Sequence, residues 1–506
     1  MEVISNLLQG FNSAMLPFNL AVCFFGALFG TIVGVLPGIG PTAAMALLLP
    51  LSFSFSPTAS LILLAGIYYG AMYGGSTTSI LLNMPGEAAS AITCIDGYQM
   101  AKKGRGGAAL AIAGIGSWVA GTIAIVGLMF FAPSLSKMAL MFGPPEYFAI
   151  AALGLLLLNN LTGGPFIKST FVMIIGLMLG TVGLEISSGY SRFTFGILSL
   201  FEGVQLIPVL MGLFGMAEVF ETIKENSQNV QVMKVKFREL YPTKGELKRS
   251  VWPIIRGTLI GFPIGLLPGP SGTLASFAAY KLEKTVSPAK KEFGKGAIEG
   301  VAAAESANNA ASTGSMIPLF ALGLPFAPPV AILLSGLMIH GIAPGPLFIS
   351  QHADIFWAVI ASMYLGNVML IILNLPLVGI FASLIKTPPK ILMPIISAIM
   401  LIGAYSLNNS LFDVGVLLFF GIIGYYMKKS DFEPSPLVIG LVLGPFLEES
   451  LMQGLGIMNG NFFAFFTRPI SAVLLGIAIL LLLWGLGGNV IKRLIVKQNS
   501  QLEGGM

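Results

Sequence analysis

A short motif that occurs twice within apolar sequence constrains this chain more than any other feature. The first copy reads GVLPGIGPTAA over residues 34–44, and the second reads GLLPGPSGTLA over residues 265–275. Both copies hold Gly, Leu, Pro, Gly, Thr and Ala at the same spacing. Pro and Gly interrupt helices, and a bilayer offers no water to the backbone groups that an interruption frees. Two such interruptions therefore predict a function that depends on broken helices.

The sequence around the motifs has the composition of a membrane protein. Hydrophobic residues make up 55% of the 506 residues and charged residues 10%, whereas soluble domains contain about 25% charged residues. Many apolar runs reach the roughly 20 residues that a helix needs to cross a bilayer. We therefore expect an all-α polytopic membrane protein with roughly 11–14 spanning helices.

The distribution of charge divides the chain into two halves. Residues 221–250 carry seven Lys or Arg and four Glu. Because basic loops stay in the cytoplasm, this segment is predicted to be a cytoplasmic linker. It separates a first transmembrane repeat, residues 1–220, from a second repeat, residues 251–506, which has an extra C-terminal helix.

The loops that follow the two motifs differ in charge. Residues 280–295 carry five Lys and two Glu, whereas residues 52–60 carry no charge. The second loop is therefore expected inside and the first outside, together with the N-terminus. Equivalent segments of opposite orientation predict two inverted-topology repeats, an architecture of many secondary transporters. The short apolar segments beside each motif favour re-entrant hairpins with broken helices over full crossings.

A second region rich in Gly, Ser, Thr and Asn follows each motif, at residues 57–86 and 300–325, and is also expected to be interrupted. Interrupted helices offer N–H groups to anions and C=O groups to cations. Ser, Thr and Asn add neutral donors and acceptors. The candidate substrate-binding residues are Gly38, Gly40, Thr42, Ser76, Thr77, Asn83, Gly269, Ser271, Thr273, Asn308 and Asn309, and the candidate cation-binding residues are Thr78, Glu305, Ser312 and Thr313. The alternative is that these small residues only pack between helices.

Three charged residues lie within or beside apolar sequence. Glu305 lies among alanines, and an ionisable group at membrane depth is a functional candidate, although a position at the membrane edge is the alternative. Glu87 follows Pro85-Gly86 and is expected to cap a helix. Arg256 either extends to the cytoplasm or meets an anionic substrate.

Several classes of function find no support in the sequence. It has no phosphate-binding loop, no Cys/His spacing typical of a metal site and no catalytic triad. No basic run is long enough to follow a nucleic acid, so no nucleic-acid partner is expected. We expect neither enzymatic activity nor a cofactor, and no metal beyond a coupling ion that is Na⁺ or H⁺.

Five longer segments resemble a known family. They are GVLPGIGPTAA (34–44), YYGAMYGGSTTSILLNMPGEAAS (68–90), DGYQMAKKGRGGAAL (96–110), GLLPGPSGTLAS (265–276) and EGVAAAESANNAASTGSMIPLFALGLP (299–325). Together they resemble the large membrane subunit of the bacterial tripartite tricarboxylate transporters, the TctA family. Ala304 stands where the family often has Pro.

The resemblance implies a carboxylate transporter of the bacterial cytoplasmic (inner) membrane that is driven by an ion gradient. It also implies two protein partners, a small membrane subunit and an extracytoplasmic solute-binding protein that delivers the carboxylate. Two alternatives remain open on the sequence: a stand-alone carboxylate transporter or channel, and an intramembrane enzyme.

Overall fold

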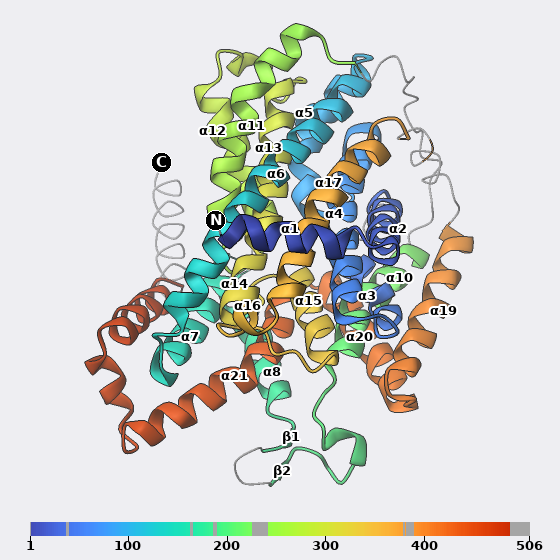
Figure 1. Ribbon diagram of the computed structural model, residues 1–506. Coiled ribbons are helices and arrows are strands. Elements are labelled where there is room, and N and C mark those ends of the chain that lie inside the picture. The colour runs from blue at the N-terminus through green and yellow to red at the C-terminus, as the bar shows by residue number, and fades with distance from the viewer. Residues whose placement is uncertain are drawn as a thin grey trace, which may run out of the picture. The chain divides into compact units, whose positions relative to one another are not determined.

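The computed structural model describes residues 2–36, 40–161, 165–185, 190–224, 241–377, 380 and 389–485 (Figure 1). These residues are mostly helical, as expected, and the two strands among them form one short antiparallel pair. Contacts divide the chain into two compact units. Unit 1 comprises Met1–Leu140 and Gln205–Tyr426, and unit 2 comprises Met141–Val204 and Met427–Met506. The two predicted repeats are inferred from similarity within the sequence, and a division by spatial contacts does not test them. They stay a prediction.

Unit 1 holds most of the helices. In chain order they are α1 (Glu2–Ala14), α2 (Pro17–Gly34), α3 (Pro41–Ser52), α4 (Pro57–Leu82), the 3₁₀ turn η1 (Ala88–Ser90), α5 (Ala91–Lys102), α6 (Gly106–Ala139), α9 (Leu206–Leu210), the π-helical η3 (Met211–Met216), α10 (Ala217–Lys224), α11 (Lys244–Gly265), α12 (Ser271–Val286), η5 (Lys290–Glu292), α13 (Ile298–Gly314), α14 (Met316–Leu322), α15 (Pro328–Ile339), α16 (Phe348–Gln351), α17 (Ala353–Asn374), α19 (Pro389–Asn408) and α20 (Leu411–Lys429). Helices α11, α12 and α13 lie side by side and meet α5 and α6 (Figure 1).

Unit 2 is built around a close helix pair. Its elements are α7 (Pro144–Leu161), α8 (Phe166–Gly180), β1 (Gly183–Leu184), β2 (Ser191–Arg192), η2 (Leu198–Leu200), α21 (Ser435–Ile457), η6 (Phe462–Thr467) and a helix over Pro469–Gly485. A Cβ atom at Gly176 of α8 would lie 2.1 Å from the carbonyl oxygen of Leu437 in α21. The two backbones therefore touch directly.

Six of the described helices are long and apolar enough to cross a membrane. They are Pro17–Gly34, Gly106–Ala139, Leu206–Ile223, Ala353–Asn374, Leu411–Lys429 and Ser435–Ile457. Shorter apolar helices, such as Pro41–Ser52 and Pro328–Ile339, accompany them. The chain is thus a multi-pass membrane protein, and the larger number of crossings expected from the sequence stays a prediction.

Two helix pairs in unit 1 pack in the same way. In α2, a Cβ atom at Gly30 would lie 2.3 Å from the carbonyl oxygen of Ile67 in α4. In α11, a Cβ atom at Gly261 would lie 2.2 Å from the carbonyl oxygen of Ala307 in α13. Small residues permit this close approach, which drives helix association where no water is present. Gly30 and Gly261 each lie four residues before a motif, so each motif emerges from an equivalent contact.

Both motifs interrupt the helix at the predicted place. Helix α2 ends at Gly34 and α3 begins at Pro41; helix α11 ends at Gly265 and α12 begins at Ser271. Pro41 is the first residue of its helix, where a missing N–H costs nothing. The short α3 cannot span a bilayer core of about 30 Å at roughly 1.5 Å per residue, which is compatible with the predicted re-entrant hairpin.

The second regions are also interrupted, and the breaks lie near the end of each region. Helix α4 runs without a break through its Gly/Ser/Thr stretch to Leu82, and Asn83 ends it with a φ of 58°. Helix α13 likewise continues to Gly314, and the break follows α14 at Gly323, with a φ of 76°. The stretches hold because their small side chains fit between packed helices and several hydroxyls bond to the carbonyl one turn earlier.

Candidate functional site

Helix α13 brings Glu305 into the interior of unit 1. The Glu305 side chain is completely buried. The hydroxyl of Ser76 in α4 donates to its Oε2 at 2.6 Å, and the hydroxyl of Thr93 in α5 donates to its Oε1. Both donors come from the first half of the chain and the acceptor from the second. The carboxyl group therefore joins the halves that the sequence places on either side of the linker.

The next turn of α13 extends this contact. Asn308 donates from Nδ2 to Oε1 of Glu87 at 2.7 Å. Asn309 donates from Nδ2 to the Ser117 hydroxyl of α6 at 2.7 Å. Glu87 precedes η1, and the hydroxyl of Ser90 accepts its backbone N–H at 3.3 Å. Glu87 is thus part of a helix start, as predicted, and its carboxylate also belongs to the polar cluster.

The second motif lies against this cluster. The N–H of Gly269 donates to the carbonyl oxygen of Phe326 at 2.9 Å, with a φ of 126° at Gly269. A Cβ atom at Gly272, in the first turn of α12, would lie 2.6 Å from Oδ1 of Asn308 and 3.3 Å from Cβ of Ala89. The start of α12 therefore faces residues of both halves, with the dipole end that favours anions.

The first motif lies beside the break that follows α4. A Cβ atom at Gly86 would lie 2.5 Å from the carbonyl oxygen of Gly34 and 2.5 Å from Cα of Gly75. Among the described residues, Gly40 has no neighbour within 4 Å of such an atom, and Gly40 is half-buried. Gly38 lies outside the described residues.

The predicted site residues fall into three groups. Ser76, Glu305, Asn308 and Asn309 meet in the cluster, and Gly269 and the buried Ser271 lie at the second motif close to it. The hydroxyls of Thr78, Ser312 and Thr313 bond to carbonyls of their own helices. Thr77 is buried in α4, Thr42 and Thr273 are half-buried in the first turns of α3 and α12, and Asn83 is an exposed residue at the end of α4.

Sequence reasoning missed Thr93 and Ser117. Both are single hydroxyls on helices that carry no break, so no motif marks them. Thr93 follows Glu87 and Ser90 at intervals of three, a spacing that favours one helix face, and this was the available signal. Ser117 had none, because its role depends on the packing of α6 against α13.

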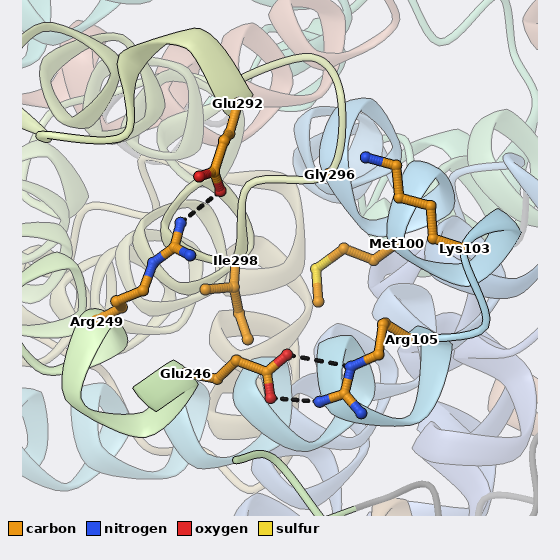
Figure 2. Close-up of a pocket in the computed structure, with 8 residues that line it drawn as sticks. All are labelled: Met100, Lys103, Arg105, Glu246, Arg249, Glu292, Gly296 and Ile298. Carbon is orange, nitrogen blue, oxygen red and sulfur yellow. Dashed lines mark hydrogen bonds and ion pairs between the residues drawn. The ribbon is translucent and has the colours of Figure 1, made fainter. Parts of the chain in front are cut away.

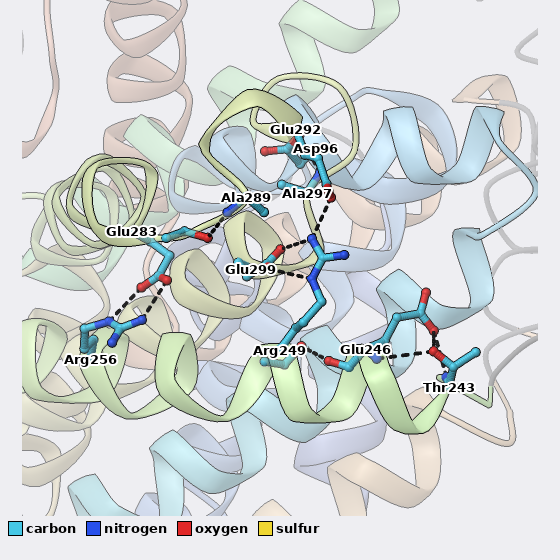
Figure 3. Close-up of polar contacts among 12 residues, drawn as sticks. Asp96, Thr243, Glu246, Arg249, Arg256, Glu283, Ala289, Glu292, Ala297 and Glu299 are labelled. Atoms are coloured by element: carbon cyan, nitrogen blue, oxygen red, sulfur yellow. Dashed lines mark hydrogen bonds and ion pairs between the residues drawn. The ribbon is translucent and has the colours of Figure 1, made fainter.

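A second polar region surrounds the start of α11. Figure 2 shows a cavity of about 90 Å³. Its lining residues are Met100, Lys103, Arg105, Glu246, Arg249, Glu292, Gly296 and Ile298. Arg249 donates to Glu299 at 2.6 Å and to Glu292 at 2.6 Å, and Arg105 pairs with Glu246 (Figures 2 and 3). Both arginines here are paired with glutamates, unlike Glu305 in the inner cluster of Ser76, Glu87, Thr93, Ser117, Glu305, Asn308 and Asn309.

These pairs set the ionisation of the groups involved. Burial alone would raise the pKa of Glu246, but hydrogen bonds from Thr243 and Arg105 outweigh burial and lower it. Hydrogen bonds to Glu299 and Glu292 raise the pKa of Arg249. Arg256 donates to Glu283 at 2.7 and 2.8 Å (Figure 3). This pair tests neither of the two roles considered for Arg256, and both stay predictions.

The comparisons with known proteins identify the family. A model described as "Tripartite tricarboxylate transporter TctA family" matches residues 20–439. The chain belongs to the TctA family. An Agrobacterium vitis protein, "Uncharacterized 52.8 kDa protein in TAR-I ttuC' 3'region", is 49% identical over 480 residues, which is 95% of each chain. A second one, "Uncharacterized protein in TAR-II ttuC' 3'region", is 47% identical over 219 residues, 43% of this chain and 90% of its own length. No solved structure matches.

Membership makes this TctA chain a subunit of a tripartite tricarboxylate transporter. A transporter subunit is expected to cross the membrane several times and to bury polar side chains between its helices, as this chain does. It also favours transport over intramembrane catalysis. Within the described residues, no group of three or more His, Cys, Asp or Glu side chains is placed to hold a metal ion.

Proposed function

We propose that this chain is the translocation subunit of a cation-coupled carboxylate uptake system in the bacterial cytoplasmic membrane. An extracytoplasmic binding protein delivers the substrate, and a small membrane subunit completes the complex. The observation that carries the proposal is the inner cluster: a TctA chain buries Glu305, Ser76, Thr93 and Asn308 where its two interrupted halves meet. Polar groups at such depth are costly unless they serve function.

The substrate carboxylates bind at the two motifs. Helices α3 and α12 both begin there, and their free N–H groups attract anions. Gly38, Gly40 and Thr42 form the first side, and Gly269, Ser271 and Thr273 form the second. The remaining predicted contacts come from Ser76, Thr77, Asn83, Asn308 and Asn309. The coupling cation, Na⁺ or H⁺, binds near Glu305, with Thr78, Ser312 and Thr313 on the adjoining turns.

The equivalent glycine contacts at Gly30 and Gly261 support a repeat, and the loop charges support its inversion. Accessibility tests this orientation directly. In a variant with Cys23 and Cys94 replaced, Ser54→Cys should react with a membrane-impermeant thiol reagent added outside. Pro288→Cys should react only when the reagent is inside. Labelling of both from one side would exclude the inverted repeat.

Uptake of labelled citrate by the purified complex in proteoliposomes tests the function. We expect uptake that requires an ion gradient and the binding protein. Gly40→Val should reduce uptake by at least about tenfold while leaving the fold intact, since a Cβ atom at Gly40 meets no neighbour among the described residues. Gly415→Val is the matched control, because Gly415 is a helix glycine with equally open surroundings. Normal uptake by Gly40→Val would show that the first motif does not contact substrate.

The same uptake assay distinguishes the tripartite system from a stand-alone transporter or channel. Uptake by this chain in the absence of the binding protein and the small subunit would make it an independent transporter or channel. Uptake that ignores every ion gradient would exclude the coupling.

A further inference from the structure

We propose that the coupling ion is a proton and that the carboxyl group of Glu305 carries it. This inference rests on the proposed transport function and specifies its energy source. It stands on the surroundings of Glu305, which suit a carboxyl group that alternates between its neutral and its charged form.

Among the described residues, Glu305 has no permanent positively charged partner. Arg249 and Arg256, the arginines of the neighbouring helix α11, are engaged with Glu292, Glu299 and Glu283. The side-chain partners that the described residues give Glu305 are two hydroxyls. A buried carboxylate with only neutral partners carries a large desolvation cost. A proton taken up from outside removes this cost, whereas a permanent ion pair would prevent the carboxylate from binding one.

The hydroxyl partners of Glu305 can bond to both its charged and its neutral form. A hydroxyl can donate to the carboxylate and can accept from the carboxylic acid. Ser76 has a second acceptor in place, the carbonyl oxygen of Met72, 3.5 Å from its Oγ. When Glu305 is protonated and donates to Ser76, the Ser76 hydrogen turns to Met72. An Arg side chain, which has donors only, could not reverse its bond in this way.

The backbone around Glu305 suits a proton better than a sodium ion. Sodium sites in transporters with broken helices draw on unwound backbone carbonyls. Here α4 continues for six residues beyond Ser76, to Leu82, and α13 continues from Glu305 to Gly314. The carbonyls beside Glu305 are therefore used by their own helices. A proton needs only the carboxyl group.

The other titratable groups that interact electrostatically with Glu305 are Tyr73 of α4, Glu87 before η1 and Cys94 of α5. None of them is basic. Glu87 is half-buried between exposed Pro85 and Ala88, and Asn308 links it to the turn of α13 after Glu305. Two buried polar atoms, Oγ of Ser306 and Oδ1 of Asn308, have no bonding partner. Ser306 faces Gly116 of α6, whereas Asn308 faces Gly272 of α12 and Glu87, so a proton reaches Glu305 along the Asn308 side of α13.

The step itself is simple. A proton from the outer solution forms an O–H bond with one Glu305 oxygen, and the hydroxyl donor on that oxygen turns to become an acceptor. Ser76 and Thr93 both belong to the first half, so protonation reverses one of the two bonds that the first half donates to Glu305. Release of the proton inside restores the carboxylate and both bonds.

Transport by the Glu305→Gln variant tests the proposal. The amide resembles the protonated acid but cannot release a proton. In proteoliposomes that contain the complete complex, wild type should accumulate labelled citrate when the outside is acidic. Glu305→Gln should lose this accumulation by at least about tenfold and keep exchange of internal for external citrate at equal pH. Glu433→Gln, at an exposed loop carboxylate, is the control and should behave as wild type.

Infrared difference spectroscopy gives a readout that needs no substrate. A protonated carboxyl absorbs apart from a carboxylate, so a pH titration of the full-length chain in lipid nanodiscs should show one buried carboxyl band that Glu305→Gln removes. Glu433→Gln should retain it. The absence of any band that depends on Glu305 would overturn the proposal.

The outcomes separate the two levels of inference. Accumulation by wild type that follows a sodium gradient and ignores a pH gradient overturns the proton assignment and leaves the transport function intact. Accumulation by Glu305→Gln at the wild-type level does the same. No citrate transport by the wild-type complex contradicts the proposed function for this substrate, and the infrared titration then decides whether Glu305 binds a proton.

Discussion

Glu299 and Glu305 lie six residues apart on the same helix, α13, and their surroundings are opposite. The Glu299 side chain is 6% exposed and accepts two bonds from Arg249. The Glu305 side chain is fully buried and accepts from Ser76 and Thr93. Both are buried glutamates, but only Glu299 has a permanent positive partner.

The difference shows how one helix serves two purposes. At the start of α13, Arg249 pairs with Glu299 and ties α13 to α11 next to the linker. Further along, hydroxyl groups satisfy Glu305 in either ionisation state. A permanent ion pair suits a contact that holds two helices together. A carboxyl group with neutral partners suits a site that binds and releases a cation. Four further experiments would break or sharpen this comparison.

The largest effect is expected from Gly261→Val, which tests whether α13 holds its position on α11. A Cβ atom at Gly261 would lie 2.2 Å from the carbonyl oxygen of Ala307. Backbone must move to admit it, so we expect a loss of at least about 3 kcal/mol of stability and little folded protein. Size-exclusion chromatography and thermal melting in detergent measure this loss. Gly415→Val is the control, and equal melting temperatures would refute the packing of α11 on α13.

The next effect is expected from Arg249→Ala, which leaves Glu299 buried without its counter-charge. Because Arg249 itself is 41% exposed, we expect a moderate loss of about 1–3 kcal/mol. Adding Glu299→Gln should recover at least half of the loss, as measured by thermal melting. If the double variant is no more stable than Arg249→Ala, the pair does not stabilise α13 in this way.

A smaller effect is expected from Ser76→Ala, which removes one hydroxyl from Glu305. A hydrogen bond to a charged group contributes about 1.5–3 kcal/mol. Uptake should therefore fall by about tenfold at high pH, where Glu305 is ionised, and by less at low pH. Ser335→Ala, which removes a hydroxyl bonded within α15, is the control. An equal loss at every pH would argue that Ser76 does not respond to the charge of Glu305.

The smallest effect concerns Glu246 and its partner Arg105. The folded protein lowers the pKa of Glu246, so its contribution to stability is complete above the ordinary pKa of about 4.3. The contribution is lost as the pH falls through the lowered value. Arg105→Gln should therefore reduce the melting temperature slightly at about pH 7 and less at about pH 3. A reduction that grows on acidification would contradict this assignment.

The family, the membrane class and the paired interruptions could be predicted from the sequence. Long apolar runs and Pro-Gly motifs are local signals, and local signals can be read directly from the amino-acid sequence. The sequence also marked Glu305 and Asn308, because charge and amide groups are rare in apolar segments. It predicted that the second regions are interrupted but not where, since the Gly, Ser and Thr stretches stay helical only because of their close packing.

The tertiary structure alone decided which of these residues meet. Ser76 and Glu305 are 229 residues apart, and no periodicity connects them. Thr93 and Ser117 became visible only because α5 and α6 pack against α13 closely enough for short side chains to bond across them. The sequence by itself determined that costly polar groups and helix breaks lie within a membrane protein. Packing determined their partners, because a hydrogen bond depends on distance in space and not on distance along the chain.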